Sequence, residues 1–182
     1  LMDECHQLIK DVDYRTDIVL PMNDFFRFKS KALVSATPIG FSDPRFKEFE
    51  TVEVSADYDY RQEIAVTHTY NIYKAISEYL GNHTEETVCF FVNSVVMIYS
   101  IMKQFDILED STVYCAPKSR LKLKNEYSFD NAYNDWNADT MKKYNFFTGR
   151  FFTAFDLDLP YQPDLVMVTD PYNSEYTMLD ID

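Results

Sequence analysis

Apolar residues in the second part of the chain recur with two periods, which predict alternating strands and helices. Short continuous apolar runs are typical of strands buried on both faces of a sheet, and apolar residues three or four positions apart are typical of helices. We expect strands at 63–69, 86–92, 112–116, 143–148 and 165–169. Helices are expected at 70–80, 95–105 and 129–136. This alternation predicts an α/β fold in which a parallel sheet carries helices on both faces.

The first 62 residues have less regular patterns. The expected elements are a helix around 23–29, an apolar strand at 31–36, a short helix from Pro44 and an alternating strand at 49–56. The polar segment 56–62 is typical of a linker. It predicts a boundary between a first domain, residues 1–56, and a second domain, residues 57–182.

Charge and composition exclude some classes of protein. The 182 residues include 17 Lys and Arg and 30 Asp and Glu, so the net charge is −13. With 46% hydrophobic residues the chain can form a core, which excludes a wholly disordered protein. Any contact with nucleic acid must use a local basic patch, because the chain as a whole is acidic. One candidate is the run Lys118, Arg120, Lys122 and Lys124, in an expected loop after the strand at 112–116.

Cysteine, glycine and hydropathy patterns argue against several kinds of site. Cys5, Cys89 and Cys115 lie far apart without a CxxC spacing, so we expect neither a zinc site nor a disulfide. The chain has three glycines and no GxxxxGK[ST] phosphate-binding loop. The first residues do not form a signal peptide, and no apolar run is long enough to cross a bilayer. We therefore expect no membrane partner and a cytoplasmic location.

Two short strings carry the candidate chemistry. The first is DECH at 3–6, and the second is SATP at 35–38, which ends an apolar run and begins 29 residues after His6. In this order and at this spacing they resemble motifs II and III of the superfamily 2 helicases, the DEAD/DEAH-box class. The resemblance implies RecA-like lobes, with ATP and Mg²⁺ as cofactors and DNA or RNA as partner.

The resemblance implies a role for five residues of these strings. Asp3 would hold Mg²⁺ through water, because this ion keeps most of its hydration shell. Glu4 would orient or deprotonate the water that attacks the γ-phosphate. His6 would contact the second string, in which Ser35 and Thr37 would couple the state of the nucleotide to that of the nucleic acid.

The later part of the chain resembles two further motifs of these helicases. The run 88–92 with its following Asn-Ser pair resembles motif IV. The segment 146–158 resembles motif V, although Ala154-Phe155 stand where the family usually has a glycine. The resemblance and the strand-end positions imply contacts with the nucleic-acid backbone. The candidates are Asn93, Ser94, Thr148, Arg150, Lys118 and Arg120, while Asp156 would contact the nucleotide.

The resemblance also implies that the chain is an internal segment of a longer motor. Residues 1–56 would be the tail of the first RecA-like lobe, and residues 57–182 a second RecA-like lobe that is incomplete at its C-terminus. The P-loop and motif VI are not among the 182 residues, so we expect the segment alone to be inactive. The missing part of the first lobe would then be a partner.

Two other interpretations stay open. The chain could be a non-catalytic α/β interaction module, whose acidic surface would favour basic protein partners. It could also be a degenerate helicase lobe that serves as a scaffold.

Overall fold

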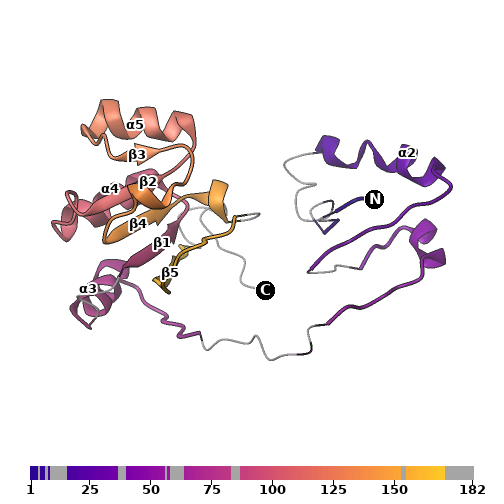
Figure 1. Cartoon of the computed structure of the whole chain (residues 1–182), viewed down its shortest axis with the longest axis horizontal. Helices are drawn as coiled ribbons and strands as arrows, with labels where there is room; N and C mark the ends of the chain where they lie inside the picture. The colour runs from indigo at the N-terminus through magenta and orange to yellow at the C-terminus, as the bar shows by residue number, and fades with distance from the viewer. Residues whose placement is uncertain are drawn as a thin grey trace. The chain divides into compact units, whose positions relative to one another are not determined.

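The computed structural model of the chain describes residues 1–3, 5, 6, 8, 16–36, 40–55, 57, 64–82, 87–152 and 155–170. The chain divides into two compact units, Leu1–Glu63 and Ile64–Ile181 (Figure 1). Each unit has its own buried side chains, and each is described by itself below.

The second unit is built on a five-stranded sheet in which every strand pairing is parallel, and this confirms the α/β class. The spatial order is β3-β2-β4-β1-β5. In chain order the elements are α3 (Ile72–Asn82), β1 (Val88–Val92), α4 (Val95–Gln104), β2 (Ser111–Tyr114), α5 (Pro117–Tyr127), β3 (Ala132–Tyr133), the 3-10 helix η3 (Ala138–Thr140), β4 (Tyr144–Phe147), the 3-10 helix η4 (Gly149–Phe151) and β5 (Asp164–Val168).

One face of the sheet forms the main core with three helices. Phe90 of β1 pairs in register with Phe146 of β4, and their stacked rings are 4.9 Å apart. Side chains from all three α-helices pack into the same cluster, among them Ile76, Ile98 and Leu123. Figure 1 shows α3, α4 and α5 beside the sheet. Burial of these apolar side chains is the main source of stability for this unit.

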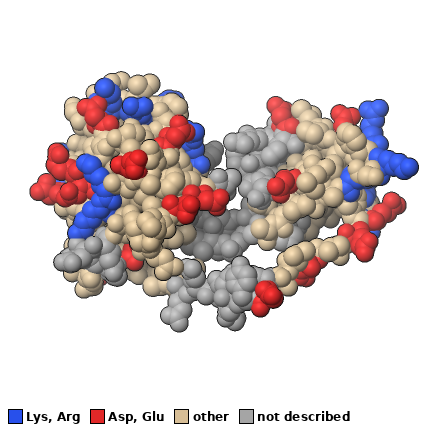
Figure 2. Space-filling model, in the orientation of Figure 1, with Lys and Arg blue, Asp and Glu red and all other residues tan. Residues whose placement is uncertain are grey.

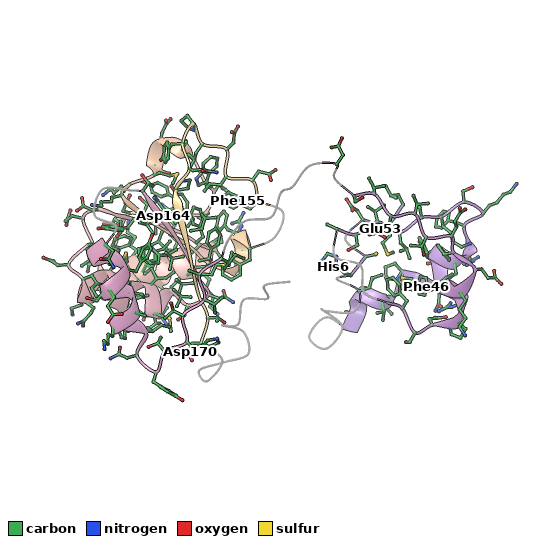
Figure 3. All side chains as sticks on the ribbon, turned by 90° about the horizontal axis from the view of Figure 1, so that it is seen from below. His6, Phe46, Glu53, Phe155, Asp164 and Asp170 are labelled. Atoms are coloured by element: carbon green, nitrogen blue, oxygen red, sulfur yellow. The ribbon has the colours of Figure 1, made fainter. Side chains whose placement is uncertain are left out.

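The opposite face of the sheet is covered by aromatic side chains and not by the α-helices that we expected there. Phe147 and Tyr114 lie there with their rings 4.8 Å apart, and Phe151 of η4 and Phe155 pack on them. Figure 3 labels Phe155. Within the described ranges, α3, α4 and α5 all pack on the first face, so the prediction of helices on both faces was wrong for this part.

The strand order explains this asymmetry. The chain moves in one direction from β1 to β2 and on to β3, through α4 and α5. It moves in the other direction from β3 to β4 and on to β5. Right-handed crossovers place the two directions on opposite faces. The return connections contain the short η3 and η4 and a few aromatic side chains in place of longer helices.

The segment after β2 corrects two sequence predictions. The basic run that we expected in a loop lies on α5, in which Leu123 is the only fully buried side chain. A single buried position gives no apolar period, so the helix could not be found from periodicity. The helix expected at 129–136 is wrong as well, because this segment forms turns and the short β3. Asn131 and Asn134 donate side-chain hydrogen bonds to the backbone of neighbouring segments, which competes with helix formation.

Two expected strands are extended segments without a strand partner. Residues 49–55 and 64–69 have no ladder in the structure, and Val54 is 91% exposed and Val66 69% exposed. Alternation alone does not make a strand, because a strand also needs a neighbour to accept its hydrogen bonds. The expected strand at 31–36 takes part in a single parallel bridge, between Leu33 and Met2.

The first unit is held together by aromatic side chains. Its elements are the 3-10 helix η1 (Thr16–Val19), α2 (Met22–Arg27) and the 3-10 helix η2 (Pro44–Glu48). Phe26 packs edge-on against Phe46, with ring centroids 4.9 Å apart, and the guanidinium of Arg45 lies 4.0 Å from the Phe26 ring centroid. Figure 3 labels Phe46. These contacts join η2 to α2 across about 20 residues of sequence.

The helices that the structure describes are all short. α3 and α5 have 11 residues each and α4 has 10. None of them is long and apolar enough to cross a bilayer, which needs about 20 apolar residues.

Replacement of Phe146 by Ala should lower the free energy of unfolding by about 3–5 kcal/mol, because this ring is fully buried and stacked on Phe90. Leu121→Ala is the matched control, with an expected change within about 0.5 kcal/mol, since Leu121 is 59% exposed. Urea unfolding followed by circular dichroism measures both. Equal costs for the two variants would contradict the assignment of the core.

Candidate functional site

The DECH segment lies directly beside the SATP segment in the first unit. The backbone N–H of Met2 donates to the carbonyl of Ala32, and the N–H of Val34 donates to the carbonyl of Met2, both at 2.9 Å. The N–H of Cys5 donates to the carbonyl of Val34 at 3.1 Å. Residues 2–5 and 32–34 therefore run parallel, and His6 and Ser35 follow them.

A side-chain hydrogen bond joins the ends of the two segments. The Nδ1 atom of His6 lies 2.7 Å from the Oγ atom of Ser35, and the His6 side chain is buried (labelled in Figure 3). Either atom can be the donor, because a hydroxyl both donates and accepts and the imidazole has two tautomers. The candidate residues His6 and Ser35 are thus in contact.

The other candidates of these strings are placed only in part. Glu4 and Thr37 lie outside the described residues. Asp3 is exposed at the end of the paired segment. Within the described ranges no group of three or more His, Cys, Asp or Glu side chains could hold a metal ion. One carboxylate still fits Mg²⁺, which proteins commonly bind through one or two carboxylates together with substrate phosphates and water.

The strand order of the second unit defines a second candidate location. From β1 the chain crosses to β2, on one side of the sheet, and from β4 it crosses to β5, on the other side. β1 and β4 are neighbours, and the connections that leave them run toward opposite edges of the sheet. In open parallel sheets, ligands bind at the carboxyl ends of the strands where the direction of crossing reverses. Asn93 follows β1 and Thr148 follows β4, so both residues lie at this reversal.

Asn93 bridges the two strand ends. Its side-chain Oδ1 accepts a hydrogen bond of 3.0 Å from the backbone N–H of Gly149. A Cβ atom at position 149 would lie only 2.6 Å from that Oδ1. The absence of a side chain at Gly149 is therefore required for this close approach.

Two hydroxyl candidates at the same edge have structural hydrogen bonds. The Ser94 hydroxyl caps α4, because its Oγ accepts from the N–H of Met97 at 3.3 Å. The Thr148 hydroxyl is buried and donates to the carbonyl of Tyr114 at 3.3 Å. These bonds hold β4 beside β2 and start α4 at the end of β1.

Two arginine side chains converge on the loop after β3. Arg150 makes an ion pair of 3.0 Å with Asp135, and Arg120 donates to the side chain of Asn134 at 3.4 Å. Asn134 in turn donates to the carbonyl of Cys115 at the end of β2. Burial raises the pKa of the Cys115 thiol to about 11, while the charges of Arg120 and Arg150 lower it.

The remaining candidates are exposed. Lys118 lies in the first turn of α5, and Lys124 on the same helix pairs with Asp130 at 3.2 Å. Figure 2 shows Lys and Arg side chains gathered over α5 beside acidic ones. Asp156 is exposed in the irregular segment 155–159. The positive charge over α5 is therefore a local patch on a chain whose net charge is −13.

Sequence reasoning missed Asn134, Asp135 and Gly149. The first two fell inside the helix that we expected at 129–136. Asn and Asp recur at 130, 131, 134, 135 and 137, which is typical of turns and could have identified this loop. Gly149 is one of only three glycines and follows a strand, which is a signal of close backbone approach.

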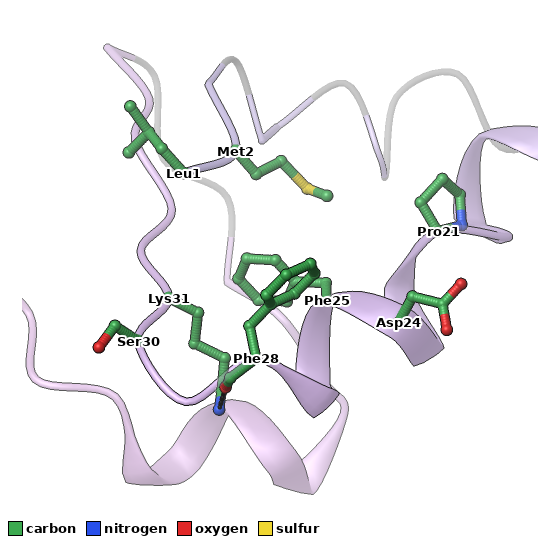
Figure 4. Close-up of a pocket in the computed structure, with 8 residues that line it drawn as sticks. All are labelled: Leu1, Met2, Pro21, Asp24, Phe25, Phe28, Ser30 and Lys31. Atoms are coloured by element: carbon green, nitrogen blue, oxygen red, sulfur yellow. Dashed lines mark hydrogen bonds between the residues drawn. The ribbon is translucent and has the colours of Figure 1, made fainter.

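The first unit also has a cavity of about 320 Å³ (Figure 4). Its lining is mostly apolar and includes Met2, Phe25 and Phe28, with Asp24 and Lys31 as its charged residues. Lys31 donates to the carbonyl of Phe28 at 2.9 Å. His6 and Ser35 do not line this cavity, so it is separate from the contact between the two strings.

No family model, curated protein or solved structure matches the chain.

Stability should fall as pH rises above about 9. Burial raises the pKa of Cys89 to about 12 and that of Cys115 to about 11, whereas a thiol in the unfolded chain titrates near 9. Above pH 9 the unfolded chain loses protons that the folded chain keeps, so unfolding becomes more favourable until the folded thiols ionise. The expected loss between pH 8 and pH 10 is about 1 kcal/mol per thiol. Urea unfolding at both pH values measures it.

The control is the double variant Cys89→Ala/Cys115→Ala, which removes both titrating groups. Its free energy of unfolding should change less between pH 8 and pH 10 than that of the unmodified chain. This comparison holds even if the double variant is less stable at both pH values. An equally steep loss in this variant would show that the two thiols are not responsible.

Proposed function

We propose that this chain is the part of an ATP-dependent nucleic-acid helicase or translocase that extends from the DECH string to about residue 158. Residues 1–56 form the tail of a first RecA-like lobe and residues 57–182 a second lobe. ATP is hydrolysed between the two lobes of the intact protein. The carrying observation is the hydrogen-bond contact between His6 and Ser35, beside a parallel bridge between Met2 and Leu33, which precede the two strings.

This contact supports the proposal because it joins the two strings across 29 residues of sequence, in the way that the resemblance implies. A chance acidic tetrapeptide has no reason to lie beside a chance Ser-Ala-Thr string. The contact also has the right chemistry for a relay, since a histidine and a hydroxyl can exchange donor and acceptor roles. A change at the nucleotide can thereby move a hydrogen bond at the SATP segment.

The second unit supports the nucleic-acid part of the proposal. Arg150, Arg120 and Lys118 follow the carboxyl ends of parallel strands, where ligands bind in this class of sheet. Arg150 already holds a carboxylate, and guanidinium groups bind phosphate oxygens in a similar geometry. A phosphodiester can therefore take the place of Asp135 at Arg150.

Asp3 and Glu4 have separate tasks in the proposed reaction. Asp3 would hold Mg²⁺ through water, and the ion would neutralise charge on the phosphates of ATP. Glu4 would accept a hydrogen bond from the attacking water and orient it. Through its hydrogen bond with Ser35, His6 would couple the binding of ATP and Mg²⁺ at Asp3 and Glu4 to the SATP segment.

Replacement of Glu4 by Gln should abolish nucleic-acid-stimulated ATP hydrolysis by the intact protein, with a loss of about 100-fold or more in kcat, because the amide cannot accept the proton of the water. Glu53→Gln is the matched control, since Glu53 is exposed on the extended segment 49–55 (labelled in Figure 3) and should have no effect. A coupled phosphate-release assay with and without single-stranded DNA or RNA measures both.

Hydrolysis that Glu4→Gln leaves intact would contradict the role of Glu4. Absence of any hydrolysis in the folded, intact protein would contradict the motor and favour the interaction module or the scaffold.

His6→Ala should reduce the stimulation by nucleic acid about tenfold and leave basal hydrolysis nearly unchanged, because it removes the contact with Ser35. Ser35→Ala should have the same effect, and the double variant should be no worse than either single variant. His68→Ala, at an exposed position, is the control. Additive losses would show that the two side chains act independently.

A further inference from the structure

Asn93 lies at the reversal of strand order with its side chain directed at protein backbone. Its Oδ1 accepts the N–H of Gly149 at 3.0 Å, and the bond joins residues 56 positions apart. A Cβ on Gly149 would lie 2.6 Å from Oδ1, 3.0 Å from Cγ and 3.1 Å from Nδ2. All three atoms of the amide group thus lie against the face of the glycine where a side chain would stand.

Gly149 begins the turn that carries Arg150. Within η4 the N–H of Phe151 donates to the carbonyl of Thr148 at 2.8 Å, and the N–H of Phe152 donates to the carbonyl of Gly149 at 3.3 Å. The N–H of Gly149 instead donates outside the turn, to the side chain of Asn93, which directly follows β1. The bond to Asn93 therefore fixes the turn relative to the next strand end, and with it the direction in which Arg150 leaves the sheet.

Arg150 is the exposed member of this arrangement. Its side chain is 46% exposed and pairs with Asp135, whose side chain is 85% exposed. A phosphate can reach this guanidinium from solvent. The Asn93 amide lies behind it, against the backbone of the turn.

We propose that Asn93 is a positioning residue for nucleic-acid binding: it acts through the N–H of Gly149 to present Arg150 to a phosphodiester, and it does not contact the nucleic acid itself. This inference rests on the proposed function, and it assigns Asn93 a role different from the direct contact implied by the sequence resemblance. Asn93, Gly149 and Arg150 then act together, and of the three only Arg150 contacts the nucleic acid.

The test measures binding of a fluorescein-labelled single-stranded 20-mer to the intact protein by anisotropy at several salt concentrations. Arg150→Ala should weaken binding and make the salt dependence shallower, by about 0.7 in the slope of log K against log salt. Asn93→Ala should weaken binding about three- to tenfold and make the slope shallower in the same direction, although it removes no charge. A purely structural defect would not change this slope.

Gly149→Ala provides an independent variant, because its Cβ must displace the Asn93 amide. It should reproduce the effect of Asn93→Ala on affinity and on slope. The double variant Asn93→Ala/Arg150→Ala should bind no more weakly than Arg150→Ala. Asn125→Ala, at an exposed position of α5, is the control and should match the unmodified chain. Thermal denaturation verifies that every variant is folded.

The outcomes separate this inference from the proposed function. If the unmodified chain binds the oligonucleotide but Asn93→Ala and Gly149→Ala leave affinity and slope unchanged, the positioning role is wrong and the proposed function stands. Additive losses in Asn93→Ala/Arg150→Ala would overturn it too, because they indicate a direct contact. If the unmodified intact protein binds neither DNA nor RNA, the nucleic-acid part of the proposed function fails, and the inference fails with it.

Discussion

The reversal of strand order between β1 and β4 is the constraint on which the second unit depends. The two strands are neighbours in a parallel sheet, yet the chain leaves them toward opposite edges. Right-handed crossovers then send α4 to one face and the aromatic return segments to the other. The backbone must diverge at this point, and the Asn93–Gly149 hydrogen bond joins the diverging ends. Asn93 and Thr148 follow these two strand ends, and Arg150 follows Thr148 in the turn after β4.

The first unit uses a smaller version of the same arrangement. Two short segments run parallel through a single bridge, and the side chains at their ends make the contact between His6 and Ser35. In both units the candidate residues follow extended segments and do not lie within them. Extended backbone bonds to a neighbouring segment, and the side chains just beyond each pair of segments join their ends.

Sequence patterns predicted the buried strands well and the exposed elements poorly. β1 was found because Val88–Val92 is apolar throughout, as burial on both faces requires. α5 was missed because only Leu123 is fully buried, and 49–56 was assigned to a strand because alternation does not reveal whether a partner exists. The contact between His6 and Ser35 was expected only from the resemblance of the two strings to helicase motifs. The pairing of Arg150 with Asp135 depends on strand order, which no local pattern contains.

The close approach of Asn93 to Gly149 has a consequence for how this sequence can change over time. A methyl group at position 149 requires that the amide at position 93 withdraw, and a smaller residue at 93 removes the reason for glycine at 149. A methyl group at 149 beside Asn93 clashes with the amide, whereas a smaller residue at 93 removes the clash but leaves the N–H of residue 149 without this acceptor. The two positions, 56 residues apart, are therefore expected to covary in related sequences, because Asn at 93 in this position fits only glycine at 149.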